Sequence, residues 1–357
     1  MKIFFSMVAC IVLTGLLNKS VNAEIKVIAA DSSYIMGDND SKIDARRIAT
    51  QEAKRKALEI AGTYIESFTE VKNMALTKDE IKAYTAGVVE TEIVSEEMKG
   101  TADHPEIFIK ARCKIDIAVL MNQINSLRKD EDLKEQLEFA VKENESLKKE
   151  RDNLVSKLST EKDKSKAEDI RKKLDTVLSK EESTDEINKV LRKNVRDMSQ
   201  AELDGAEVIL KKALKVNPEN QRAHALLAVI YRKKGDAAGA GKELREAIKS
   251  NPSYPLYHMK LGQFLKDSGK YAEALKEFVF VDRLKPNKPD VLYNIGMTYK
   301  ATGECKACVY YLKKFLGVIK KDERIPEKMR NDAIKAVKEC EDKTKRKQAE
   351  KRPYIHR

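Results

Sequence analysis

Four cysteines that follow Ala23 are the most chemically specific feature of this chain: Cys113, Cys305, Cys308 and Cys340. Cys305 and Cys308 have the Cys-x-x-Cys spacing of redox and metal half-sites. Residue 309 is a valine, so no haem-attachment motif forms, and no second cysteine pair or suitably spaced histidine completes a zinc site. We therefore expect no metal and no cofactor, and we favour a structural disulfide over a catalytic role for these thiols.

The remaining titratable residues form no recognisable catalytic set. The four histidines are His104, His224, His258 and His356. The chain lacks a His-Glu-x-x-His motif, a Gly-x-Ser-x-Gly motif, a phosphate-binding glycine loop and a dinucleotide fingerprint. The carboxylates alternate with lysines, as they do on solvated helix faces. These observations predict a protein that is not an enzyme.

A repeat with a constant period organises the second half of the chain. Its clearest markers are the prolines at 218, 252 and 286, with glycines at 235, 269 and 303. Small and large residues recur in the same register: Leu227, Leu261 and Ile295; Ala228, Gly262 and Gly296; Ala240, Ala274 and Cys308; Leu244, Phe278 and Leu312. These markers recur every 34 residues. A fixed period of this length is typical of stacked pairs of helices, because one pair cannot bury its apolar faces alone.

This pattern closely resembles the tetratricopeptide repeat, although His224, His258 and Leu292 stand where that family usually has tryptophan. The resemblance implies an all-α solenoid of about four units over residues 183–322, closed by a capping helix over 323–345. It also implies that the first helix of each unit lines a concave groove. The groove residues that map onto this chain are Arg222, Arg232, Lys233, Lys260, Gln263, Lys266, Tyr293, Asn294 and Lys300.

The predicted groove is basic and carries amide groups, which suits an acidic peptide or protein segment. The alternative is that these lysines only solvate the surface. The resemblance also implies a disulfide pairing, because consecutive helices of the repeat run antiparallel. Cys305 and Cys308 open the second helix of the fourth unit, and Cys340 lies near the end of the capping helix. We therefore expect Cys340 to pair with Cys308 or Cys305, with Cys308 the better partner.

The N-terminal segment up to Ala23 has the features of a secretory signal peptide. Lys2 precedes a largely apolar run over residues 4–17, and Val21-Asn22-Ala23 offers a cleavage site before Glu24. The alternative is an uncleaved anchor. We expect cleavage and export, and in a bacterium with two membranes a periplasmic or other cell-envelope location.

Residues 24–125 combine strand-like and helix-like patterns and predict an α+β module. Strands are expected over 24–29, 90–97 and 107–119, helices over 44–62 and 78–86, and an extended link over 63–71. The runs Ala45 to Ala49 and Ala61 to Ser67, with Leu76-Thr77 and Ala86-Gly87, resemble the N-terminal domain of the flagella assembly protein T. That resemblance implies an exported module and carries no catalytic motif.

Residues 126–182 predict a helical coiled-coil connector. Leu133, Ala140, Leu147 and Leu154 repeat at heptad spacing beside Leu137 and Leu158, while Asn144 and Arg151 interrupt the seam. A weak homodimer through this seam is one expectation, and a single solvated helix is the alternative. Residues 183–186 look like a helix start that leads into the repeats. The tail over 346–357 is basic and expected to be disordered, and we expect no nucleic-acid partner.

Taken together, these patterns predict a multidomain protein with an α+β N-terminal module, a helical connector and a repeat solenoid. The function that we expect is that of an exported, non-enzymatic scaffold or adaptor that binds a protein or peptide. Two alternatives remain: a structural protein of the envelope or of flagellar assembly that acts through its N-terminal module, and an accessory subunit of a cell-wall enzyme. No membrane span is expected after removal of the leader.

Overall fold

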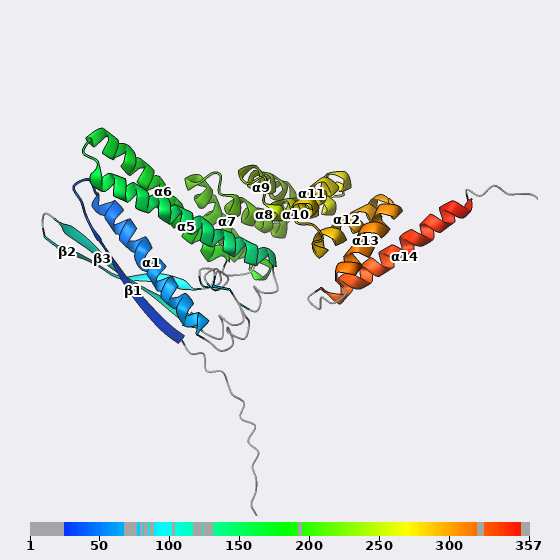
Figure 1. The fold of residues 1–357 in the computed structure, drawn as a ribbon, viewed down its shortest axis with the longest axis horizontal. Helices are drawn as coiled ribbons and strands as arrows, with labels where there is room; N and C mark the ends of the chain where they lie inside the picture. The colour runs from blue at the N-terminus through cyan, green and yellow to red at the C-terminus, as the bar shows by residue number, and fades with distance from the viewer. Residues whose placement is uncertain are drawn as a thin grey trace, which may run out of the picture.

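The computed structural model describes residues 25–67, 77–78, 81, 85, 89–101, 104–116, 124, 131–191, 195–319 and 325–350. The expected leader over 1–23 and the end of the expected tail over 351–357 lie outside this part, as does most of the expected helix over 78–86. The described chain is elongated (Figure 1): a small sheet with its helix lies at one end, followed by a helical hairpin, a row of paired helices and a long final helix.

Three antiparallel strands form the N-terminal sheet in the order β1-β3-β2. They are β1 (Ile25–Ile35), β2 (Glu90–Gly100) and β3 (Pro105–Asp116). Helix α1 (Lys42–Glu66) starts at Ser41, whose side chain caps the amide of Asp44, and it covers one face of the sheet (Figure 1). Its buried side is a stripe of small residues that permits close contact with the strands: Ala45, Ala49, Ala53, Ala57 and Ala61.

Helix α1 continues through Glu66, so the extended link that we expected from residue 63 does not begin there. Tyr64 and Ile65 extend the helical pattern, and Ile65 is buried in the same core as the alanine stripe. The short run Thr63 to Glu66 contains β-branched and aromatic residues, which suggested a strand. Burial of Ile65 against the sheet outweighs that local preference.

The expected connector is a helical hairpin of α5 (Glu131–Thr160) and α6 (Lys164–Leu191). The seam residues Leu147, Leu154 and Leu158 are buried together with the α6 residues Leu174, Val177 and Leu178. The seam that we expected to face a second chain is thus covered by the same chain. The expected helix start at 183–186 is also wrong, because Ser183 and Thr184 are buried inside α6, which crosses the predicted boundary.

The repeats follow a short 3-10 turn (Val195–Asp197) and α7 (Gln200–Val216). Three helix pairs then succeed one another: α8 (Gln221–Lys234) with α9 (Ala237–Ser250), α10 (Pro255–Asp267) with α11 (Tyr271–Leu284), and α12 (Pro289–Thr302) with α13 (Cys305–Val318). Gly235, Gly269 and Gly303 make the turn inside each pair at φ values of 85°, 74° and 78°, which other residues rarely adopt. Three of the roughly four predicted repeat units are therefore helix pairs, and the single helix α7 precedes them.

The final helix, α14 (Glu327–Glu350), packs against α13 as the expected cap but extends past residue 345 into the stretch that we expected to be disordered. One cluster of buried apolar side chains joins the sheet and α1 to α6, α7 and α8. In the part of the chain that the structure describes, no helix is both long enough and apolar enough to cross a membrane.

Candidate functional site: the face of the first helices

The first helices of the pairs, α8, α10 and α12, carry all the residues that the sequence assigned to a groove; we call this surface the first-helix face. Its first member, Arg222, is buried, with 1% of its surface exposed. Its Nη1 donates to Oε2 of Glu143 on α5 at 3.2 Å, and its Nη2 donates to Oδ1 of Asn188 on α6 at 2.6 Å. Arg222 is therefore an internal contact, and its prediction as a groove residue is wrong.

Helix α5 covers the beginning of the first-helix face. Besides the Arg222 contact, Glu143 accepts a hydrogen bond from Asn220, which caps α8. The ring of Phe139 lies 5.7 Å from that of Tyr254, the residue before α10. The acidic group that we expected from a partner is thus supplied here by the chain itself, together with an aromatic contact. Sequence reasoning missed this contact because a heptad pattern shows which helix side is apolar, but not what its other sides touch.

The next predicted cations lie at the end of α8. Arg232 and Lys233 are exposed. The ammonium of Lys233 donates to the carbonyls of Val195 and Met198 at 2.9 and 2.6 Å, so it caps the turn before α7. Arg232 remains a surface cation beside this contact.

Lys266 is the most informative residue of the first-helix face. It is half-buried on α10, and its ammonium donates to Oδ1 of Asn294 on α12 at 2.6 Å. Burial lowers the pKa of Lys266, although Asp267 opposes that change. Asn294 is itself oriented, because its Nδ2 donates to the carbonyl of Asp290 at 2.8 Å. Among the described residues, no carboxylate forms an ion pair with this ammonium.

Four further predicted residues lie on the same two helices: Lys260, Gln263, Tyr293 and Lys300. Lys260 and Gln263 lie half-buried on α10. Lys300 pairs with Glu339 of α14 at 2.9 Å, and this contact raises the pKa of Lys300. The Tyr293 ring lies 5.4 Å from that of Phe315. Helix α14 thus occupies the far end of the first-helix face, and Lys266 lies between the parts that α5 and α14 cover.

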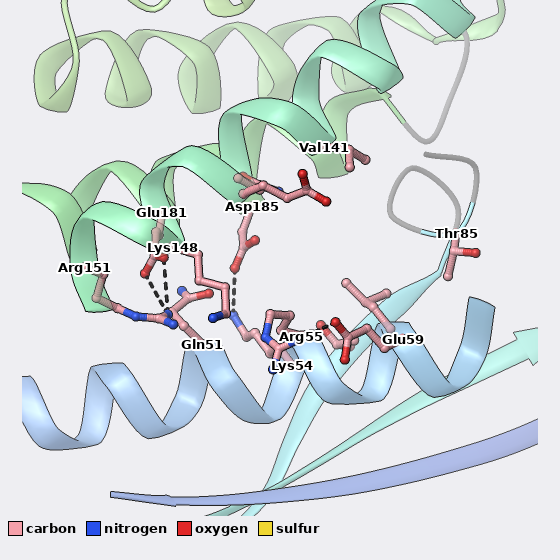
Figure 2. A pocket seen from close by; sticks show the side chains of 14 residues that line it. Gln51, Lys54, Arg55, Glu59, Thr85, Val141, Lys148, Arg151, Glu181 and Asp185 are labelled. Carbon is pink, nitrogen blue, oxygen red and sulfur yellow. Dashed lines mark hydrogen bonds and ion pairs between the residues drawn. The ribbon is translucent and has the colours of Figure 1, made fainter. Parts of the chain in front are cut away.

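A second candidate is a cavity of about 380 Å³ between α1 and the α5–α6 hairpin (Figure 2). Two ion pairs join charged groups that line it. Lys54 lies 3.2 Å from Asp185, and the nearly buried Arg151 lies 3.2 Å from Glu181. Asn144 and Arg151, the two polar residues that interrupt the leucine seam, both line this cavity. The interruption therefore marks the joint between the N-terminal module and the hairpin, and not a hydrated dimer seam.

The three C-terminal cysteines lie together. Cys308 and Cys340 are buried, Cys305 is half-buried, and all three belong to the cluster that packs α14 against α13. Burial raises the pKa of the Cys340 thiol to about 12, and the neighbouring thiols of Cys305 and Cys308 add to this effect. The thiols are free in this structure, so the expected disulfide stays a prediction. No group of three metal-binding side chains was found in the described segments.

Comparison with known proteins supports the repeat. Residues 197–264 match the family model described as tetratricopeptide repeat. Similar solved structures include MamA (21% identity, 42% of this chain, 93% of that chain, TM-score 0.33) and Pseudomonas aeruginosa PilF (23%, 45%, 71%, 0.38). A third is YrrB, described as a TPR protein with an unusual peptide-binding site (22%, 52%, 85%, 0.37). No curated protein matches.

The family match concerns the helical repeats. The resemblance of residues 24–125 to the N-terminal domain of flagella assembly protein T stays a prediction. What the matches add to the geometry is an identity for one region: this chain carries tetratricopeptide repeats over residues 197–264, and its helix pairs continue the same period to the end of α13.

Proposed function

We propose that this chain is an exported, non-enzymatic scaffold that binds an acidic segment of a partner protein on the first-helix face, at Lys266 and Asn294. The carrying observation is the half-buried ammonium of Lys266, whose hydrogen-bond partner is a neutral amide. Taking a charge out of water costs free energy that an opposite charge offsets. A carboxylate from a partner would supply that charge, and Asn294 would fix its approach.

The neighbouring side chains favour a peptide segment over a small anion. Gln263 and Met297 are half-buried beside Lys266 and offer an amide and a flexible apolar chain. The Arg222–Glu143 contact shows that the first-helix face already holds one carboxylate, carried by a helix of the same chain. A partner would therefore occupy the stretch of α10 and α12 that lies between α5 and α14.

The test compares a fluorescent peptide rich in aspartate with the same peptide carrying asparagine, added to the full-length protein. We expect tighter binding of the aspartate peptide, weakened by salt because charge pairing is screened. Lys266→Met, which keeps the apolar stem, should weaken that binding about tenfold, or about 1.4 kcal/mol.

The matched control is Lys276→Met on α11, whose lysine is exposed on a second helix. It should leave the affinity unchanged. The proposal is contradicted if the aspartate and asparagine peptides bind with equal affinity, or if the two variants lose the same amount of affinity. Lys266 would then be a cation that only solvates the surface.

Export is part of the proposal and rests on the apolar run and on Val21-Asn22-Ala23. Intact-mass measurement of the protein isolated from its native cell tests it, with a mature N-terminus at Glu24 as the expected result. A protein that retains Met1 would contradict cleavage.

A further inference from the structure

Three thiols meet where α14 packs back along α13. Cys305 is the first residue of α13, Cys308 lies one turn later, and Cys340 lies on α14. Their common surroundings are apolar, with Leu312, Phe315 and Ala336 in the same cluster. Three thiols in one cluster can exchange partners, which two cannot, because a disulfide forms and isomerises by attack of one sulfur on another.

The three thiols differ in accessibility. Cys308 and Cys340 are 0% and 2% exposed, whereas Cys305 is half-buried at the helix start. Burial raises the pKa of the Cys308 thiol, and it raises that of Cys340 to about 12, with the neighbouring thiols adding to the effect. A buried thiol of high pKa is a slow nucleophile and is shielded from a bulky oxidant. Cys305 is therefore the thiol that an oxidant reaches first.

Cys340 lies where a disulfide would fix α14 against the repeats. The residues on either side of it, Glu339 and Glu341, pair with Lys300 of α12 at 2.9 Å and Lys313 of α13 at 2.7 Å. Exposed pairs of this kind stabilise weakly. A covalent bond at Cys340 would fix the position of α14, which these ion pairs stabilise only weakly. It would also hold Glu339 against Lys300 at the end of the first-helix face.

We propose that Cys305, Cys308 and Cys340 form a redox clasp, in which Cys305 takes up the oxidant and Cys340 closes a reversible covalent bond between α13 and α14. The clasp is independent of the proposed partner binding. It also differs from the pairing expected from sequence, where Cys308 was the favoured direct partner, because the structure leaves Cys305 as the accessible sulfur.

The oxidant is a low-molecular-weight or protein disulfide. The Cys305 thiolate attacks one sulfur of that disulfide, forms a mixed disulfide and releases the first thiolate. Cys340, losing its proton, then attacks Sγ of Cys305 and releases the second thiolate. Two protein thiols are thereby oxidised, and one disulfide is reduced to two thiols. Cys308 can next attack Sγ of Cys340, which frees Cys305 without net oxidation.

The experiment treats the reduced full-length protein with oxidised glutathione, blocks free thiols at intervals and maps the bonds by mass spectrometry. We expect one intrachain bond that contains Cys340. Cys305→Ser should slow its formation about tenfold, because the accessible thiol is lost. Cys308→Ser should form the Cys305–Cys340 bond at the rate of the unchanged protein and stop there.

Cys113 is the internal control. It is buried beneath α1, its thiol donates to the carbonyl of Ala57, and burial raises its pKa to about 11. It should stay reduced throughout. The clasp is refuted if Cys340 remains open to blocking reagent after oxidation, if Cys305→Ser oxidises as fast as the unchanged protein, or if the bonds join separate chains. Cys340→Ala, which keeps the site apolar, should form no bond between α13 and α14.

Discussion

Two histidines of the repeats bridge the same pair of groups in successive units. Nδ1 of His224 lies 2.6 Å from Glu243, and Nε2 lies 2.9 Å from the carbonyl of Pro218. His258 repeats these distances with Glu277 and Pro252. A carbonyl only accepts, so Nε2 must carry a proton, and a carboxylate at Nδ1 favours a proton there too. For His258, this arrangement stabilises the charged imidazolium.

For His258 the balance of effects is visible in its pKa. Burial lowers the pKa of this imidazole, but the hydrogen bonds to Glu277 and to the Pro252 carbonyl outweigh burial and raise it above its ordinary value. A raised pKa in the folded state stabilises the fold below the unfolded value of about 6.5. This contribution is lost as the pH rises through the folded pKa.

We expect Glu277→Gln to lower the free energy of unfolding at pH 5.5 by about 1.5–3 kcal/mol, the usual range for a hydrogen bond to a charged group. The loss should shrink toward pH 8, where the unchanged protein also loses the charge on His258. Chemical denaturation at a series of pH values measures it. An effect of Glu277→Gln that is constant with pH would mean that His258 stays neutral.

For single residues, the sequence predicted positions in the repeat better than hydrogen-bond partners. The register of the repeat placed both histidines at the position where the family usually has tryptophan, but it did not predict their contacts with Glu243 and Glu277. The missed signal was internal to the repeats: Glu243 and Glu277 follow their histidines at one and the same spacing, and the unit without the histidine has Leu292 and Tyr311 at the matching places. Lys266 shows the same limit, because its lack of a carboxylate partner depends on where every other side chain lies.

Between elements, the contact of paired helices is controlled by one small residue on each first helix. A Cβ atom on Gly262 would lie 2.6 Å from the Phe278 ring, and one on Gly296 would lie 2.6 Å from the Leu312 side chain. Ala228 holds the same position opposite Leu244. All three pairs therefore keep a small residue at this position, and at Gly262 and Gly296 the partner side chain leaves no room for a Cβ atom.

Gly262→Ala should therefore lower the free energy of unfolding by about 1–3 kcal/mol through overpacking, even though alanine favours helix. Gly205→Ala is the control, since nothing lies within 4 Å of a Cβ atom at that position on α7. That change should raise the free energy of unfolding by about 0.5–1 kcal/mol. Thermal or urea unfolding compares the two. If both changes stabilise the protein, the Phe278 ring can move aside at the α10–α11 contact without a large cost in free energy.

The sequence predicted most of these elements because periodicity reports which side of a segment is apolar. It could not report what covers that side. The leucines of α5 fit a partner chain as well as they fit α6, and only the polar break over residues 161–163 allowed the chain to turn back on itself. The edges of α1 and α6 were missed for a related reason: buried contacts extend helices past local signals such as Thr63 and Ser183.

At the scale of the whole molecule, α5 is the element that connects the N-terminal module to the first repeats. It packs on α6 through its leucines, contacts α1 through Arg151 and Glu52 at 3.4 Å, and reaches the repeats through Phe139 and Glu143. The continuous apolar cluster from the sheet to α8 reinforces this connection. The N-terminal module and the first repeats are therefore expected to unfold together, and not as separate domains.

Glu143→Ala tests this connection, because Glu143 pairs with the buried Arg222. The change leaves Arg222 with Asn188 alone, and an uncompensated buried cation costs about 2–3 kcal/mol. The free energy of unfolding should fall by that amount, and amide hydrogen exchange should rise in α8 and α10 while α1 stays protected. Glu246→Ala, which removes an exposed pair with Lys249, is the control and should cost less than about 1 kcal/mol.

The pattern of exchange decides between two arrangements of the molecule. If α5 only borders the repeats, Glu143→Ala will loosen α8 near the mutation and leave α10 as protected as before. If α5 holds the start of the first-helix face in place, α10 will loosen too, because Phe139 and Glu143 approach Tyr254 and Arg222 from the same helix. In that case calorimetry should resolve two transitions in the variant where the unchanged protein has one, since the repeats would then melt before the α1–α6 core.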